Sequence, residues 1–216
     1  MGQKVNPHVI RLGTVHTWSS RWFNERDYKS VVIEDYGLRT MLMQRLKTAG
    51  ISRVEIERSI NSLKIIIYVS RPGIVIGRGG TGLEDLKKRI LAFFAKLKKD
   101  KKAMPKLDIR VEPVKEPNLD AYLVAVNIGD QLARRLPFKR VLAATAERVM
   151  GSGARGVKIL LTGRIGGAEI ARREKIHLGT VPLSTIRAEI GYAQVPTLTK
   201  KGYIGVKVWI HRPEEK

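Results

Sequence analysis

The feature that most constrains the fold is a glycine-rich segment between a strand pattern and a helix pattern. Residues 73–82 read Gly-Ile-Val-Ile-Gly-Arg-Gly-Gly-Thr-Gly and follow the apolar run 65–69 after a short break. A helix pattern begins directly after them, with apolar residues at alternating spacings of three and four: Leu83, Leu86, Ile90, Phe93 and Leu97. Glycines at such a junction let the backbone approach a ligand closely. They also leave the N–H groups of the helix start free to bind it, which favours phosphate.

Several interpretations of these glycines compete. Gly77-x-Gly79-x-x-Gly82 matches the dinucleotide fingerprint of oxidoreductase-like folds. Those folds need an acidic residue about twenty positions later, and the candidate, Asp100, lies within a run of lysines. A Walker loop is excluded because no Lys-Ser or Lys-Thr follows the glycines. Gly77-Arg78-Gly79-Gly80 also matches the Gly-x-x-Gly loop with which KH domains hold about four nucleotides of a single strand. The surrounding charge favours this interpretation over dinucleotide binding or a turn without a ligand.

The charge of the chain points to a polyanionic partner. Its 216 residues carry 41 Lys and Arg against 20 Asp and Glu, a net charge of +21, while 43% are hydrophobic, as in globular proteins. Nucleic acid is the expected polyanion. A membrane is disfavoured because no apolar run approaches 18 residues and the basic segments lack an apolar aromatic face.

The sequence indicates neither a cofactor nor catalytic chemistry. It has no cysteine, which excludes disulfides and thiolate zinc sites and fits a reducing cytosol or organelle matrix. The four histidines are scattered without metal-ligand spacing, and there is no nucleophile elbow or carboxylate cluster. We therefore predict no catalytic residue, no metal and no cofactor.

An irregular arm is predicted over residues 1–24, where glycines and a proline break any period. Lys4 and Arg11 lie in this arm together with Trp18, Trp22 and Phe23. Cations beside aromatic rings suit RNA, because phosphates pair with the charges and bases stack on the rings. Alternatively, the tryptophans anchor the arm to a core.

A first α+β domain is predicted over residues 25–112. The pattern indicates a helix over 27–49 in two pieces broken at Gly37, and two strands joined by a hairpin turn at 59–62. The glycine loop and its helix, which carries Lys87 and Lys88, come next, and a third strand lies at 107–111. This order matches the type II arrangement of KH domains, with Gly77, Arg78, Gly79 and Gly80 as RNA-binding candidates.

A linker is predicted at 113–118, followed by a second α+β domain over 119–216. Two helices are indicated, the first capped by Asp120 and the second beginning after Pro137. Four strands follow, at 157–161, 175–178, 186–193 and 203–210. The basic residues of this domain are expected to bind RNA collectively, since few acids accompany them; they include Lys139, Arg140, Arg164, Arg172 and Arg173.

Five longer stretches, distributed along the whole chain, resemble one protein family. They are Met1-Gly-Gln-Lys-Val-Asn-Pro7, Ile10-Arg-Leu-Gly13, Arg71-Pro-Gly-Ile-Val-Ile-Gly77, Gly163-Arg-Ile-Gly-Gly-Ala-Glu-Ile-Ala-Arg172 and Gly205-Val-Lys-Val-Trp-Ile210. The chain is similar to the bacterial-type small-subunit ribosomal protein three family, the KH-containing proteins of the subunit's head. The 163–172 stretch is the most specific, because the Gly-x-x-Gly loop alone would indicate only a KH domain.

The resemblance implies binding to small-subunit rRNA in the head, contact with ribosomal proteins ten and fourteen, and a position at the mRNA entry channel. It also implies that Lys139 and Arg140 help unwind mRNA, although a third basic position of the family's pattern is Ala143 here. The expected location is the ribosome of a cytoplasm or an organelle matrix. The alternatives are a free-standing KH-type regulator of mRNA and, from a different class, a dinucleotide-binding enzyme.

Overall fold

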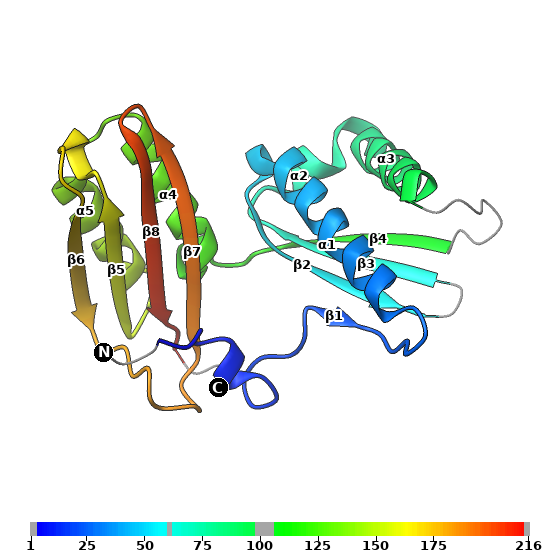
Figure 1. The fold of residues 1–216 in the computed structure, drawn as a ribbon, viewed down its shortest axis with the longest axis horizontal. Helices are drawn as coiled ribbons and strands as arrows, with labels where there is room; N and C mark the ends of the chain where they lie inside the picture. The colour runs from blue at the N-terminus through cyan, green and yellow to red at the C-terminus, as the bar shows by residue number, and fades with distance from the viewer. Residues whose placement is uncertain (1–3, 60–61, 98–105, 214–216) are drawn as a thin grey trace. The chain divides into compact units, whose positions relative to one another are not determined.

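The chain forms two compact units in a computed structural model that describes residues 4–59, 62–97 and 106–213. Trp18–Lys115 make up one, here called the glycine-loop unit, and Met1–Thr17 with Glu116–Lys216 make up the other, the carboxy-terminal unit (Figure 1). The arm predicted over 1–24 is thus divided between the two units after residue 17. The division at 115 falls within the predicted linker at 113–118.

The glycine-loop unit is a four-stranded sheet covered on one face by helices (Figure 1). Its strands have the order β1-β2-β3-β4; β2 and β3 are antiparallel, and the other pairs are parallel. Alternate residues of β3 (Leu63, Ile65 and Ile67) are buried in the core. The predicted mixed α+β fold is confirmed in this unit. Its elements are β1 (Ser20–Arg21), α1 (Tyr28–Arg45), η2 (Lys47–Ala49), β2 (Ile51–Arg58), β3 (Ser62–Val69), α2 (Pro72–Ile76), η3 (Arg78–Gly80), α3 (Thr81–Leu97) and β4 (Lys106–Pro113).

The prediction of a helix broken at Gly37 was wrong, because α1 runs through this residue without interruption. A Cβ atom built on Gly37 would lie 2.8 Å from Cζ of Phe93, closer than real Cβ contacts. Gly37 therefore lets α1 pack closely against the ring of Phe93 on α3, and this packing offsets its low helix propensity. The predicted hairpin at 59–62 has its central residues, 60 and 61, outside the described residues.

A buried polar network fastens the start of this unit to α1. The Arg58 guanidinium donates to Glu34 Oε2 at 2.7 Å and, through Nε, to Asp35 Oδ1 at 2.8 Å. The other Asp35 oxygen accepts from Ser20 Oγ and Trp22 Nε1, both at 2.9 Å. Asp35 is only 2% exposed, so these bonds satisfy a carboxylate that burial would otherwise penalise. Trp22 is thus an anchor, one of the two roles considered for the tryptophans.

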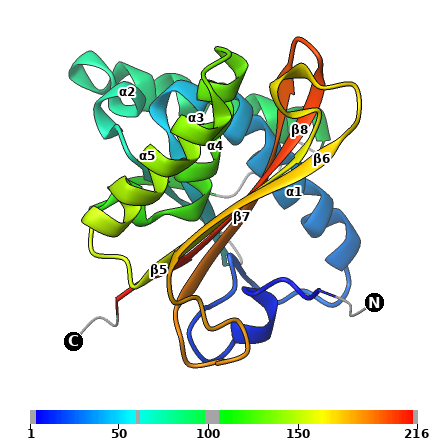
Figure 2. The same ribbon diagram turned by 90° about the vertical axis from the view of Figure 1, so that its left-hand side faces the viewer.

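The carboxy-terminal unit is an antiparallel sheet of order β6-β5-β8-β7 with α4 and α5 on one face (Figure 2). The predicted cap is confirmed: Asp120 Oδ1 accepts from the backbone N–H groups of Tyr122 at 2.9 Å and Leu123 at 3.0 Å. The elements are η1 (Val9–Arg11), η5 (Pro117–Leu119), α4 (Ala121–Ala133), α5 (Phe138–Gly151), β5 (Gly156–Gly163), η6 (Ile165–Gly167), β6 (Arg172–Gly179), β7 (Ile190–Thr199) and β8 (Gly202–His211).

The strand predicted at 186–193 was misplaced, because β7 begins only at Ile190 and runs to Thr199. The chain before it is a turn whose carbonyl oxygens accept hydrogen bonds from the buried Arg11 side chain instead of from a neighbouring strand. Pro196 is accommodated because β7 is an edge strand of the sheet.

His8 of the amino-terminal segment also contacts β7. His8 Nε2 lies 3.0 Å from the backbone nitrogen of Tyr192 and 3.2 Å from the carbonyl oxygen of the same residue. Burial lowers the pKa of His8, and the neighbouring His16 lowers it further. The neutral imidazole is therefore favoured at this position.

Candidate nucleic-acid interface

The glycine loop is a tight left-handed turn whose outer side is open. Gly77, Gly79 and Gly80 have φ values of +70°, +62° and +81°, which other residues rarely adopt. A Cβ atom on Gly79 or Gly80 would meet nothing within 4 Å. The glycine segment is shorter than predicted, because residues 72–76 form α2 with Pro72 at its first position.

The loop packs tightly against the start of α3. A Cβ atom on Gly82 would lie 2.5 Å from the carbonyl oxygen of Val75 and 2.9 Å from that of Ile76. The backbone N–H of Thr81, the first residue of α3, donates to the carbonyl oxygen of Arg78, so the loop closes onto the helix start. A dinucleotide fingerprint needs glycines that follow a strand directly, whereas α2 lies between β3 and this loop. Asp100 lies outside the described residues.

Exposed cations and apolar side chains lie in the loop and on the two helices that flank it. Arg78, Lys87 and Lys88 are exposed, and none of them forms an ion pair with another residue that the structure describes. On α2, Ile74 and Ile76 are 50% and 38% exposed. Cations for phosphates and apolar surface for bases are the two components that single-strand binding requires.

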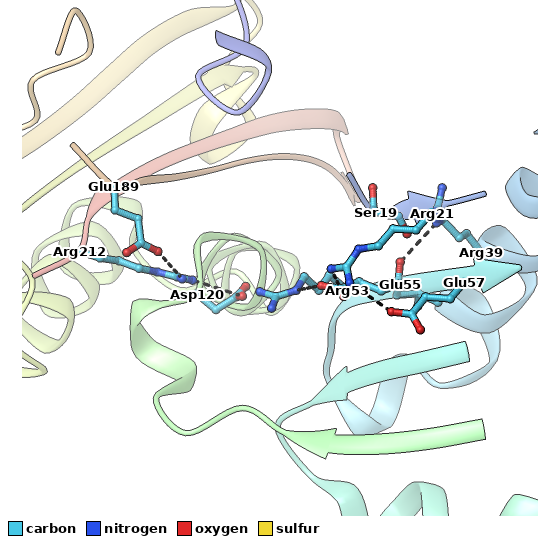
Figure 3. A network of polar contacts seen from close by, with 10 residues as sticks. Ser19, Arg21, Arg39, Arg53, Glu55, Glu57, Asp120, Glu189 and Arg212 are labelled. Carbon is cyan, nitrogen blue, oxygen red and sulfur yellow. Dashed lines mark hydrogen bonds and ion pairs between the residues drawn. The ribbon is translucent and has the colours of Figure 1, made fainter. Parts of the chain in front are cut away.

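The outer face of the same sheet differs, because Arg21, Arg53 and Lys64 on it are already paired. Arg21 lies 3.3 Å from Glu55 and 3.1 Å from Glu57, and Arg53 lies 3.0 Å from Glu55 (Figure 3). Lys64 Nζ is 2.9 Å from Glu57, and this hydrogen bond is the main cause of the lowered pKa of the Glu57 carboxyl. Cations neutralised in this way attract phosphate less than those beside the glycine loop.

In the carboxy-terminal unit, Lys139 and Arg140 are exposed in the first turn of α5. The buried face of α5 includes Val141 and Leu142, so neither cation belongs to the core. The first turn carries no acidic residue to offset them against the helix dipole, which disfavours cations at this end. Ala143, which stands at the third basic position of the family pattern, is half-buried.

The other predicted cations of this unit lie around the β5–β6 connection. Arg164 is exposed and donates through Nε to the carbonyl of Ala168 at 2.8 Å. The Arg172 guanidinium lies 5.4 Å from the ring centroid of Phe138, the first residue of α5. This contact places Arg172 beside Lys139 and Arg140. Arg173 is exposed on β6, opposite Thr162 of β5.

The two cations predicted in the amino-terminal arm have different surroundings. Lys4 is exposed, as a residue that binds RNA must be. Arg11 is completely buried, and its guanidinium donates to five backbone carbonyl groups of the carboxy-terminal unit. The prediction that Arg11 binds RNA is therefore corrected: its donors face the interior of the fold. Trp18 and Phe23 remain 68% and 86% exposed.

Sequence reasoning missed Lys200 and Lys201, which lie at the turn between β7 and β8. Adjacent lysines before a glycine are the signal that would have found them. It also missed the network of Asp35 and Arg58, for which no spacing rule exists. Of the lysines in the 96–102 segment, only Lys96, which is exposed, lies within the described residues.

Two searches of the described residues gave negative results. No group of three or more His, Asp or Glu side chains that could hold a metal occurs among residues 4–59, 62–97 and 106–213. Over the same ranges, no helix is both long and apolar enough to cross a membrane.

Comparison with known proteins covers both units. Residues 37–119 match the KH domain model, and residues 128–210 match the model of ribosomal protein S3, C-terminal domain. Small ribosomal subunit protein uS3 of Lachnoclostridium phytofermentans is 43% identical over 99% of this chain and 94% of its own length. The uS3 proteins of Desulfitobacterium hafniense and Bacillus cytotoxicus are each 44% identical over the same shares. With a KH domain in its glycine-loop unit and relatives that match it from end to end, the chain belongs to the uS3 family of small ribosomal subunit proteins.

Proposed function

We propose that this protein is a structural component of the small ribosomal subunit that binds rRNA in the head and helps to form the mRNA entry channel. Its location would be the ribosome in the cytoplasm, with ribosomal proteins ten and fourteen as neighbours. The observation that carries the proposal is the identity of 43–44% with uS3 relatives over almost the whole chain. Family membership also excludes the alternative of a dinucleotide-dependent enzyme.

The distribution of exposed charge supports a division of labour between the units. The glycine loop with Lys87 and Lys88 would hold rRNA, as would Lys4, Arg164, Arg172 and Arg173. Lys139 and Arg140 would contact incoming mRNA. Each of these side chains is exposed, and Lys139 and Arg140 lie in the first turn of α5, where backbone N–H groups add to the attraction for phosphate.

Sedimentation tests this proposal against a free-standing KH regulator. A ribosomal component should sediment with small subunits at low salt and remain with them through a gradient. Recovery of the protein only in the unbound fraction, bound to mRNA, would favour the regulator.

Gly79→Asp is expected to weaken binding of the full-length protein to single-stranded RNA about tenfold, which corresponds to roughly 1.4 kcal/mol. The new side chain would occupy open space on the outer side of the loop and place a carboxylate where phosphate approaches. Asp tolerates a positive φ better than most residues, so the melting temperature should change little. Fluorescence anisotropy with a labelled oligonucleotide measures the affinity.

Gly79→Asn is the matched control, because it has the same shape without the charge. It should lose much less affinity than Gly79→Asp. If both folded variants bind RNA as the parent does, the loop does not hold the strand.

Replacing both Lys139 and Arg140 with alanine is expected to slow translation through a stable mRNA hairpin while sparing an unstructured message. Neither side chain is buried, so folding and incorporation into subunits should be unaffected. Because Ala143 already lacks the third charge, the defect should be partial. Single-round translation of paired reporter messages measures the effect.

The control exchanges the two residues, Lys139→Arg with Arg140→Lys, and keeps both charges. It should unwind nearly as well as the parent. Equal speeds on both messages for the alanine variant would show that these residues do not unwind mRNA.

A further inference from the structure

A cavity of about 390 Å³ opens in the carboxy-terminal unit, where the α4–α5 turn, η6 and the β7–β8 turn meet. Figure 1 shows these three connections at the same end of the sheet. The apolar part of the lining includes Leu132, Leu136, Phe138 and Ile204. The volume is within the range of pockets that bind small organic groups.

The rim of this cavity is basic. Arg135, Arg164, Lys200 and Lys201 line it, and no acidic residue is found among the described residues of the lining. None of these cations forms an ion pair with a residue that the structure describes. A cavity with an apolar wall and several unneutralised cations is complementary to a ligand that joins a flat apolar group to negative charge.

Arg135 occupies a backbone position at which glycine is the usual residue. Its N–H donates to the carbonyl of Leu132 at 3.0 Å, and the N–H of Leu136 donates to that of Gln131 at 3.2 Å. These two bonds form a Schellman motif at the end of α4, with Arg135 in the left-handed position at φ +65°. Among the described residues, no other non-glycine has a positive φ. Arg135 therefore raises the conformational energy of the backbone relative to glycine at this position.

We propose that this cavity receives one unstacked nucleobase of a single-stranded RNA, with its neighbouring phosphates held by Arg135, Arg164, Lys200 and Lys201. The inference rests on the proposed RNA binding of this unit. The base would contact Leu136 and the ring of Phe138, as bases contact apolar and aromatic side chains in other RNA-binding proteins. Lys139 and Arg140 follow Phe138 directly, so a strand that leaves the cavity along α5 would meet them next.

RNA fits these features better than an acidic protein segment. Every residue of an RNA strand carries both a flat base and a charge, whereas an acidic peptide needs a particular order of residues to present the two together. The net charge of +21 also favours a polyanion whose charge is regularly spaced.

The first test uses the full-length protein and a short oligouridylate that contains 5-iodouridine. Leu136→Ser removes an apolar side chain from the cavity lining without changing the charge. Ile186→Ser is the control, because Ile186 lies outside the cavity and its side chain is 48% exposed, against 47% for Leu136. We expect Leu136→Ser to bind roughly fivefold more weakly, as loss of one base contact predicts, and Ile186→Ser to bind as the parent does. Photocrosslinks should map to the peptide that contains Phe138.

The second test separates function from stability. Arg135→Gly relieves the left-handed strain and removes a cation, so the melting temperature without RNA should rise by about 4 °C while RNA affinity falls. Arg134→Gly removes the same charge at the adjacent residue, where φ is −78° and glycine relieves no strain. It should not raise the melting temperature, and it should weaken binding less.

The outcomes distinguish this inference from the proposed function. If Leu136→Ser and Arg135→Gly bind the oligonucleotide as the parent does while Gly79→Asp does not, the cavity proposal is overturned and RNA binding stands. If the parent itself binds no RNA, the proposed function fails first. If the cavity variants keep RNA affinity but lose a neighbouring protein in reconstituted subunits, the cavity binds protein, and the nucleobase proposal is likewise overturned.

Discussion

Arg11→Leu is expected to destabilise the carboxy-terminal unit by about 3 kcal/mol or more. The guanidinium donates to the carbonyl oxygens of Ala188 at 2.8 Å, Thr185 at 2.9 Å, Leu183 and Pro7 at 3.0 Å, and Pro182 at 3.4 Å. Leucine would leave these carbonyls without donors, and the turn before β7 would have to rearrange. Urea unfolding measures the loss, and limited proteolysis should show new cleavage between residues 182 and 188.

Two variants serve as controls for this effect. Arg11→Lys keeps the charge but lacks the planar fork that reaches several carbonyls at once, so it should recover only part of the stability. Lys4→Leu removes an exposed cation from the same arm and should change stability by less than about 0.5 kcal/mol. If Arg11→Leu is as stable as the parent but binds RNA more weakly, Arg11 is an RNA contact after all.

Binding to an rRNA head fragment is expected to weaken log-linearly with salt concentration. Each phosphate neutralised contributes a slope of about −0.7 on a single strand, and about −0.9 on B-form duplex DNA, the nearest reference for paired regions. Six single-strand contacts would give a slope of about −4 and roughly a 250-fold loss of affinity between 50 and 200 mM salt. Filter binding across a salt series measures the slope, and a flat response would refute electrostatic binding.

The structure adds a matched pair of variants to this experiment. Lys87 is exposed and makes no ion pair with a described residue, whereas Lys64 is paired with Glu57 at 2.9 Å. Lys87→Gln should reduce the magnitude of the slope by about 0.7, the contribution of one phosphate. Lys64→Gln should leave the slope nearly unchanged. Equal changes for both would mean that total charge matters and its placement does not.

The sequence predicted those parts of the fold that depend on local chemistry. Asp120 was recognisable as a helix cap because the free N–H groups of a helix start need an acceptor. Leu63, Ile65 and Ile67 were recognisable as one face of a strand because successive strand residues alternate between faces. The conformation of Gly79 follows from the same kind of rule, since its positive φ suits glycine. The exposed candidates on the helix that follows it, Lys87 and Lys88, were likewise predicted from charge and helical spacing.

Tertiary structure alone decided features that depend on residues far apart in the chain. Gly37 lies within a continuous helix because the Phe93 ring packs against it, and β7 starts late because Arg11, about 180 residues earlier, binds the carbonyls before it. From its sequence neighbours, Arg11 was indistinguishable from the exposed Lys4. A positive charge in the sequence does not reveal whether its partner is a distant carbonyl, a nearby carboxylate or a phosphate. That depends on burial, which only the folded chain determines.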